Sequence, residues 1–220
     1  MLNKEKHRTL MFQIIKDIFN SNIWKYLAFK WWTCCYFLYS LDRFSTDLDF
    51  DLIDNSKNID EELLKKKKKY GSLKIWNKIV LSYWESDVNI KVDINRKIWK
   101  NNTYEFINFY WNTIRVQDKS TIFANKLVAL IERHTNRDIY DVYFMFLNMF
   151  DINEKIILER TWWNKKELFL KVKQKLEKLP KNYKILDWLG EVLDEKQKTF
   201  VKNKLVLELL WIIEMKINFD

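Results

Sequence analysis

Glycine is almost absent from this chain, and its scarcity limits how the backbone can turn. The 220 residues include two glycines, Gly71 and Gly190, and one proline, but 11 tryptophans. Average usage is about 7% glycine, which would be roughly 15 in a chain of this length. Turns often require a positive φ, which glycine accepts and bulky residues resist. Turns of this kind must therefore fall mostly on residues that carry a side chain.

Several tryptophans stand where a chain usually turns. Trp76 and Trp84 each lie between two β-like runs, and Trp162 and Trp163 lie between two helical patterns. Tryptophan and glycine together make up about 6% of the chain, close to the usual share of glycine alone. We hypothesise that many or all of the tryptophans are UGA codons that the source organism reads as glycine. The alternative is a genuinely tryptophan-rich protein, and the codons at these positions distinguish the two.

The composition predicts a well-packed protein. Hydrophobic residues make up 48% of the chain and aromatic residues 16%, which is enough to form a core. No apolar run approaches the ~20 residues that span a bilayer, and the charged segment from Met1 to Arg8 is unlike a signal peptide. The adjacent Cys34 and Cys35 are expected to be core residues in a reducing compartment. We therefore expect a soluble, cytoplasmic protein with no membrane partner.

The net charge of +9 arises from 39 basic and 30 acidic residues. A basic surplus suits a polyanionic partner such as RNA or nucleotide phosphates. Simple solubility is the competing explanation, and the charge alone does not separate the two.

The spacing of apolar residues divides the chain into a mixed half and a helical half. In the first half it predicts helices over 10–19, 33–41 and 59–68, and strands over 26–29, 47–53, 78–83, 88–95 and 113–116. From Ser120, a candidate helix cap, it predicts helices over 121–133, 137–150, 165–179 and 195–216. We therefore expect an α+β fold. A small mixed β-sheet with flanking helices over 1–118 is followed by an all-helical domain over 119–220.

The segment 47–53 alternates strictly between acidic and apolar residues, which predicts a strand with one buried and one acidic face. Asp47, Asp49 and Asp51 would share the acidic face, where like charges repel. A divalent cation removes this conflict, and Mg²⁺ prefers carboxylates together with substrate phosphate oxygens. The competing readings are a solvent-facing acidic strand or a Ca²⁺ loop, but the regular alternation disfavours the loop.

The segments 29–33 and 43–52 resemble the AbiEii/AbiGii-type toxin family of nucleotidyltransferases. The family's signature is a Gly-Gly-Ser/Thr turn, a helix and an Arg-Phe-Ser-x-Asp-x-Asp strand, and Trp31-Trp32 stand here where the family has the paired glycines. The resemblance implies that Trp31, Trp32 and Thr33 form the nucleotide-binding turn, in which backbone N–H groups hold the triphosphate. Indole rings would block the approach of the phosphates, so genuine tryptophans predict a crippled site.

A second resemblance to the same family lies in the helical half. The segments 125–130 and 137–143 are similar to the family's helical Lys and Arg-Asp-x-x-Asp motifs. By resemblance, Lys126 contacts the nucleotide phosphates and Asp138 belongs to the active site. Asp141 would share a helix face with Asp138. The competing reading is an exposed ion pair between Asp138 and Arg137.

Three further residues are candidates for the site. Asp93 lies on a predicted strand and could supply a third carboxylate, as in polymerase-β-like nucleotidyltransferases, or simply be solvated. Ser45 and Arg43 match the family pattern and could position the substrate or brace the turn. A cleft between the two halves would bring the strand carboxylates against Lys126 and Asp138.

The resemblance implies a Mg²⁺-dependent enzyme of abortive-infection and type IV toxin–antitoxin systems. Such an enzyme transfers a nucleoside monophosphate from an NTP to an acceptor, here expected to be RNA such as tRNA. Asp47 and Asp49 would bind the metal and act in catalysis with Lys126 and Asp138. A cognate antitoxin encoded nearby is also implied. The alternatives are a non-catalytic, basic RNA-binding module on the same scaffold, which genuine Trp31-Trp32 would favour, and a small-molecule nucleotidyltransferase.

Overall fold

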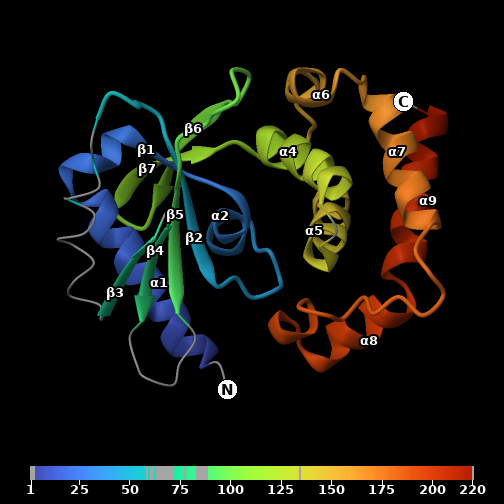
Figure 1. The fold of residues 1–220 in the computed structure, drawn as a ribbon, viewed down its shortest axis with the longest axis horizontal. Helices are drawn as coiled ribbons and strands as arrows, with labels where there is room; N and C mark the ends of the chain where they lie inside the picture. Colours follow the sequence, from blue (N-terminus) through green and yellow to red (C-terminus); the bar gives the residue numbers. More distant parts are fainter. Residues whose placement is uncertain are drawn as a thin grey trace. The chain divides into compact units, whose positions relative to one another are not determined.

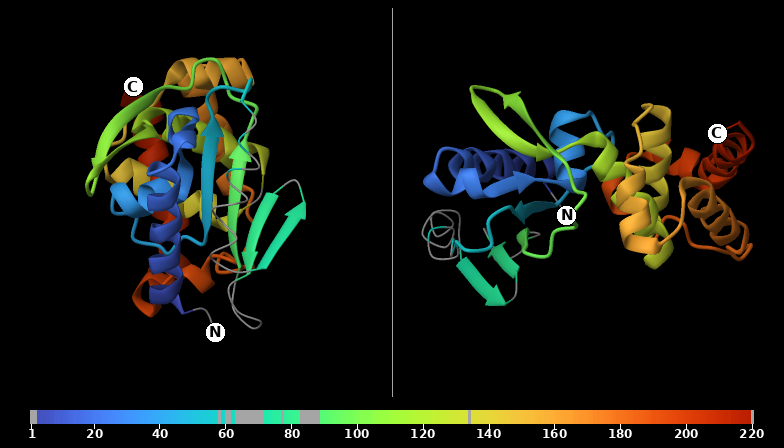
Figure 2. Two further views of the ribbon diagram at one scale, coloured as in Figure 1. Left: turned by 90° about the vertical axis from the view of Figure 1, so that its left-hand side faces the viewer. Right: turned by 90° about the horizontal axis from the view of Figure 1, so that it is seen from above.

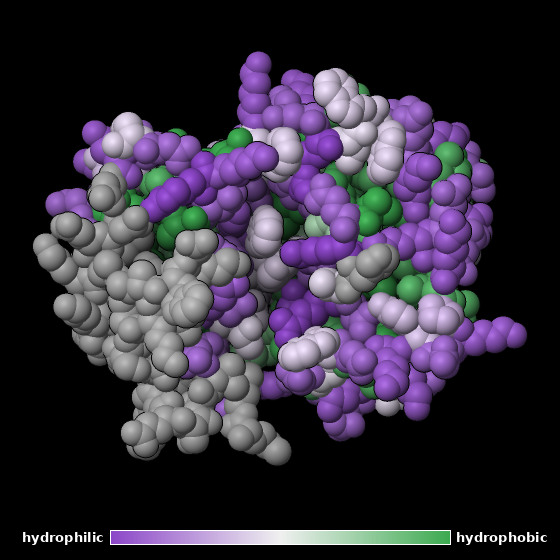
Figure 3. Space-filling model, viewed as in Figure 1, coloured by the Kyte–Doolittle hydropathy of each residue, from purple (hydrophilic) through white to green (hydrophobic). Residues whose placement is uncertain are grey.

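The computed structural model describes residues 3–57, 59, 62, 72–76, 78–82, 89–133 and 135–219. The chain divides into two compact units. Unit 1 comprises Met1–Ile98 and Tyr104–Gln117, and unit 2 comprises Trp99–Thr103 and Asp118–Asp220. Hydrophilic side chains cover most of the described surface on the face drawn in Figure 3. Among the described helices, none is long and apolar enough to cross a bilayer.

Unit 1 is built on a seven-stranded sheet with the strand order β3-β4-β5-β2-β1-β7-β6 (Figure 1). The strands are β1 (Leu27–Phe29), β2 (Asp47–Leu52), β3 (Ser72–Trp76), β4 (Lys78–Ser82), β5 (Ile90–Asn95), β6 (Tyr104–Phe109) and β7 (Asn112–Gln117). β2 pairs in parallel with β5, and β1 in parallel with β7, whereas the other neighbouring pairs are antiparallel. The predicted mixed sheet is therefore confirmed.

In the described part of unit 1, two helices and one 3-10 helix accompany the sheet: α1 (Lys4–Phe19), η1 (Asn22–Tyr26) and α2 (Trp31–Leu38). Asn3 caps α1, because its side chain accepts a hydrogen bond from the backbone N–H of Lys6 at 3.0 Å. Figure 2 shows α1 running alongside the strands. The Phe19 ring of α1 lies 6.2 Å from the Phe50 ring of β2, which anchors the helix to the centre of the sheet.

The structure confirms most elements predicted for unit 1 and corrects others. α2 begins at Trp31 and not at residue 33, and strand β6 was not predicted. β6 lies at an edge of the sheet and only its last residue is buried, so its sequence lacks the alternation that marks a half-buried strand. The helix predicted over 59–68 falls almost entirely outside the described residues.

The predicted acidic face of β2 is not open to solvent. All residues of the strand after Asp47 are buried, with Asp49 at 9% and Asp51 at 0% relative exposure. The reading of a solvent-facing acidic strand is therefore wrong for these two residues. Burial makes their charges costly unless partners or a cation neutralise them.

Unit 2 is helical, as predicted. It contains α4 (Lys119–Glu132), α5 (Asn136–Leu147), α6 (Glu154–Thr161), α7 (Lys165–Glu177), η3 (Gly190–Val192), α8 (Glu195–Asn203) and α9 (Leu205–Phe219). The helix predicted over 195–216 is interrupted at Lys204, and α6 was not predicted. Ser120 is not the cap of α4. Asp118 is, because its Oδ1 accepts from the backbone N–H of Thr121 at 2.9 Å.

Candidate active site

Strand β2 places two of the predicted carboxylates beside a third from β5. In the parallel pairing of these strands, Asp49 stands opposite Asp93 and Asp47 opposite Lys91. Residues opposite each other share a face of the sheet, so Asp47, Asp49 and Asp93 gather on one face of unit 1. The Asp93 side chain is 26% exposed, and its Oδ2 lies 3.9 Å from Lys91 Nζ.

The charged form of Asp49 is unfavourable in this position. Burial is the largest cause that raises its pKa. The neighbouring Asp47 and Asp93 raise the pKa further, whereas Lys30 and Lys91 lower it. The result is a pKa of about 7. A cation that binds beside such a carboxyl group stabilises its charged form. The pKa of the group then falls back towards its usual value.

Asp51 shares the face of Asp47 and Asp49 but has a different role. Its Oδ1 accepts from Lys30 Nζ at 2.7 Å and from Asn95 Nδ2 at 2.9 Å. Its Oδ2 accepts from Tyr104 Oη at 2.9 Å and from Gln117 Nε2 at 3.4 Å. These donors adjoin or belong to β1, β5, β6 and β7, so Asp51 ties β2 to much of the sheet and is already neutralised.

Lys30 is a residue that the sequence analysis missed. It is 4% exposed and follows β1 directly, and its backbone N–H donates to Asp49 O at 3.0 Å. Its ammonium pairs with Asp51. The available signal was a lysine placed between an apolar strand and the start of a helix, where a charged side chain needs a buried partner.

The turn that follows Lys30 is attached to the start of β2. Thr33 is fully buried; its hydroxyl donates to the carbonyl of Asp47 and lies 2.7 Å from Ser45 Oγ. The N-cap residue of α2 makes no side-chain capping bond. The first turn of α2 is therefore held against the start of β2 by the hydroxyl of Thr33.

Trp31 and Trp32 occupy the predicted nucleotide-binding turn. Trp31 has a φ of 59°, in the left-handed region, and the centroids of the two indole rings lie 5.6 Å apart. Lys30 Nζ lies 4.5 Å from the Trp31 ring centroid, and the Arg43 guanidinium 5.8 Å from that of Trp32. Arg43 is 2% exposed. The indole of Trp31 thus lies beside Lys30 and that of Trp32 beside Arg43; the role of this turn in nucleotide binding stays a prediction.

In unit 2, Lys126, Asp138 and Asp141 form a buried ion-pair network between α4 and α5. Lys126 Nζ pairs with Asp138 and lies 2.7 Å from Asp141 Oδ2, and none of the three residues is more than 1% exposed. Arg133 Nε lies 2.8 Å from Asp138 Oδ2, and the Thr135 hydroxyl also donates to Asp138. The reading of Asp138 as an exposed partner of a neighbouring arginine is therefore wrong.

The network holds Asp138 ionised. Burial works against the charge, but Lys126 and Arg133 outweigh it and bring the pKa of this carboxyl well below its usual range. Arg137, the alternative partner, donates instead to the carbonyl of Trp188, at 3.2 Å from Nε and 3.1 Å from Nη2. The predicted approach of this network to the carboxylates of unit 1 stays a prediction.

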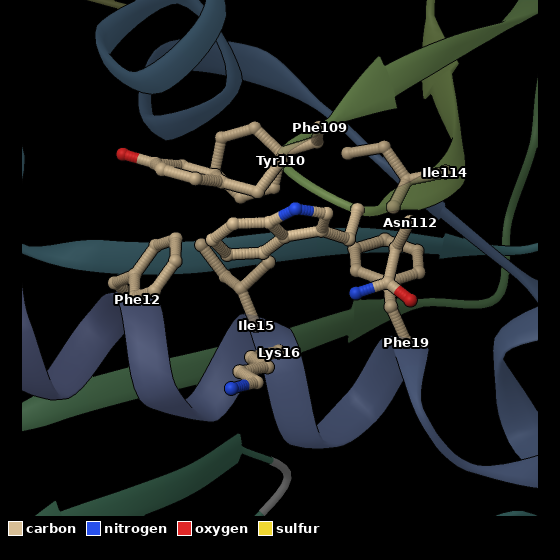
Figure 4. Close-up of a pocket in the computed structure, with 9 residues that line it drawn as sticks. Phe12, Ile15, Lys16, Phe19, Phe109, Tyr110, Asn112 and Ile114 are labelled. Carbon is tan, nitrogen blue, oxygen red and sulfur yellow. The ribbon is translucent and has the colours of Figure 1, made fainter.

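An apolar pocket of unit 1 lies apart from every predicted site residue. It is lined by α1 and the β6–β7 hairpin, with Phe12, Ile15, Phe109, Tyr110 and Trp111 among its walls (Figure 4). None of its lining residues carries a carboxylate. It therefore offers no carboxylate that could hold a metal ion for phosphoryl transfer.

Two solved structures share the fold of this chain. JHP933 from Helicobacter pylori is 21% identical, with a TM-score of 0.64 over 99% of this chain and 94% of that one. A candidate nucleotidyltransferase from H. pylori is 23% identical, with a TM-score of 0.64 over 98% and 95%. At these identities the likeness shows a shared fold. A search of curated proteins gave no match.

The sequence model of the family "Nucleotidyl transferase AbiEii toxin, Type IV TA system" matches residues 27–199. This range is most of the chain and includes both the acidic strand and the helical Lys and Asp motifs. The chain belongs to this family of nucleotidyltransferase toxins. The resemblance expected from the motifs is thereby confirmed, and the family implies a cognate antitoxin and an NTP substrate.

Proposed function

We propose that this protein transfers a nucleoside monophosphate from an NTP to an RNA acceptor, with release of pyrophosphate. The observation that carries the proposal is the position of Asp49, which is buried beside Asp47 and Asp93 with its pKa raised to about 7. The net charge of +9 supports a polyanionic acceptor. NTPs and RNA are cytoplasmic, so we expect the protein to act there.

Asp47 and Asp49 suit a magnesium ion. Within the described residues, no group of three or more His, Cys, Asp or Glu side chains is arranged to hold a metal by itself. Mg²⁺ is commonly bound through one or two carboxylates together with waters and substrate phosphates. Asp47 and Asp49 would supply the two carboxylates. When bound, Mg²⁺ would neutralise charge on the triphosphate and on the two carboxylates.

We assign a positioning role to Lys126. Its ammonium is 1% exposed and lies between Asp138 and Asp141. Direct contact with a phosphate would require the ammonium to leave both carboxylates, which is costly for buried charges. We propose that it orients Asp138 and Asp141, and that Asp138 belongs to the catalytic set. Arg43 and Ser45 brace the turn that precedes β2.

The test is incubation with labelled NTPs, Mg²⁺ and total tRNA, using both the chain as printed and a Trp31→Gly/Trp32→Gly variant. Label on RNA that disappears in Asp49→Ala supports the proposal. Asp54→Asn is the matched control, because Asp54 lies outside the acidic cluster and bonds Ser56 in the loop after β2. Label on a small acceptor instead of RNA would overturn the RNA assignment.

A non-catalytic RNA-binding module is the second candidate, and one observation favours it. Trp31 and Trp32 stand in the turn where a nucleotidyltransferase needs room for phosphates. RNA binding without transfer, by the chain as printed and by the double variant alike, would support this module and contradict the proposed enzyme.

A further inference from the structure

Three tryptophans adopt a backbone conformation that bulky residues avoid. Trp31, Trp162 and Trp188 have φ values of 59°, 63° and 61°. They are three of the ten tryptophans that the structure describes, whereas among all other described non-glycine residues only Ser40, Tyr110 and Met149 have a positive φ. In this region the Cβ of an L-residue crowds the following carbonyl oxygen, and glycine alone enters it freely.

Trp162 occupies a position that glycine usually takes. It ends α6 in the left-handed conformation, with ψ of 11°, and its backbone N–H donates to Leu158 O at 3.0 Å. Helices very commonly end with a left-handed glycine that makes this kind of bond. The indole is 84% exposed. The backbone of Trp162 therefore helps to end the helix, whereas its side chain lies mostly in solvent.

Trp188 shows the same division between backbone and side chain. Its carbonyl accepts two hydrogen bonds from the Arg137 guanidinium. Its indole is 76% exposed. The conformation that brings the carbonyl to Arg137 would be open to glycine without strain.

We infer that the polypeptide made in the source cell carries glycine at positions 31, 162 and 188, because the UGA codon there is read as glycine. Positions 162 and 188 lie in unit 2 and outside the nucleotide motifs, so the inference does not depend on the proposed function. At position 31, glycine would remove an indole from the start of α2, which deepens the proposed function by giving an NTP room to bind. This last consequence rests on that proposal.

The gene and the native protein provide the direct test. We expect UGA codons at the three positions and, in peptides of the protein isolated from its source, the residue mass of glycine. UGG codons, or peptides with the mass of tryptophan, would overturn the inference.

Thermal unfolding of the recombinant protein tests the conformational argument. We expect Trp162→Gly and Trp188→Gly to melt about 2–4 °C above Trp162→Ala and Trp188→Ala, as a difference near 1 kcal/mol does in a chain of this size. The matched control is Trp211, 63% exposed within α9, where the glycine variant must melt below the alanine variant. Glycine variants that melt no higher than alanine variants at both 162 and 188 would refute the argument.

Binding of labelled NTP by Trp31→Gly/Trp32→Gly separates the two proposals. Tighter binding than by the chain as printed supports the consequence for position 31. If the codons are UGA and the double variant still binds no NTP, the proposed function fails and the glycine inference stands.

Discussion

Each unit holds a buried aspartate beside other charged side chains, Asp49 in unit 1 and Asp138 in unit 2, but the pKa values of the two are shifted in opposite directions. In unit 1, burial together with Asp47 and Asp93 raises the pKa of Asp49 to about 7. In unit 2, Lys126 and Arg133 overcome burial and lower the pKa of Asp138. The amount of burial is similar, so the difference comes from the charge of the neighbours and not from desolvation alone.

The two groups differ in whether their own side chains balance the charge. The network of Lys126, Asp138 and Asp141 is neutralised by its own side chains and stays ionised without help. The carboxylates on β2 and β5 retain a mutual repulsion that a bound cation would relieve. We therefore expect a cation to bind at the carboxylates of unit 1, whereas Lys126 already balances Asp138 and Asp141 in unit 2.

The largest expected effect on stability comes from removing the ammonium group of Lys126 in unit 2. Lys126→Met leaves Asp138 and Asp141 buried together without their shared ammonium. Removing one partner of a buried ion pair costs about 3–5 kcal/mol, so we expect the free energy of unfolding to fall by this amount in urea denaturation.

The control for this prediction is Lys166→Met, because Lys166 is exposed in α7. It should change the free energy of unfolding by less than about 0.5 kcal/mol. Equal stability of the Lys126 and Lys166 variants would show that the network does not hold α4 to α5.

The corresponding lysine in unit 1 should matter less. Lys30→Met removes the cation beside Asp51, but Asn95, Tyr104 and Gln117 continue to donate to the carboxylate. We expect a loss of about 1–3 kcal/mol, as for a charged hydrogen bond. A loss larger than that of Lys126→Met would reverse the ranking of the two networks.

The third prediction concerns the sign of the pH dependence. Because the folded state holds the proton of Asp49 up to a pH of about 7, and the unfolded state loses it near pH 4, this group destabilises the fold as the pH rises between these values. Asp138 behaves oppositely. Its contribution to stability is present above the ordinary pKa of aspartate and is lost as the pH falls below it.

Melting of the metal-free protein checks the sign for Asp49. Asp49→Asn should stabilise the protein at pH 8 by roughly 1–3 kcal/mol and give no gain at pH 4. Asp187→Asn, at an exposed position of unit 2, should be neutral at both. A destabilised Asp49→Asn at pH 8 would mean that the carboxylate is satisfied within the protein.

Local patterns predicted much of the fold and part of the site. Strict alternation identified β2 and β5 because a strand's period of two needs no knowledge of its partners. The same rule failed for β6, an edge strand with little burial. The interruption between α8 and α9 at Lys204 has no proline or glycine to mark it.

The contacts between distant segments could not be predicted in the same way. Alternation assigned Asp51 to the face of Asp49, but four donors from separate parts of unit 1 converge on it only after folding. Lys30 was missed for the same reason, since its partner lies 21 residues away. The hydrogen bonds from Arg137 to the carbonyl of Trp188 likewise join residues that are 51 positions apart.

The smallest expected effect is stabilisation by the cation itself. Mg²⁺ at about ten times its dissociation constant would add about 1.4 kcal/mol to the free energy of unfolding, because it binds the folded carboxylates and not the unfolded chain. We expect this gain in the unaltered protein and its loss in Asp47→Asn and Asp49→Asn. Asp138→Asn, corrected for its own lower stability, should keep the gain, since the carboxylates of unit 1 are intact. If Mg²⁺ stabilised the Asp49 variant as much as the parent, the cation would bind elsewhere and the contrast between the two units would lose its functional meaning.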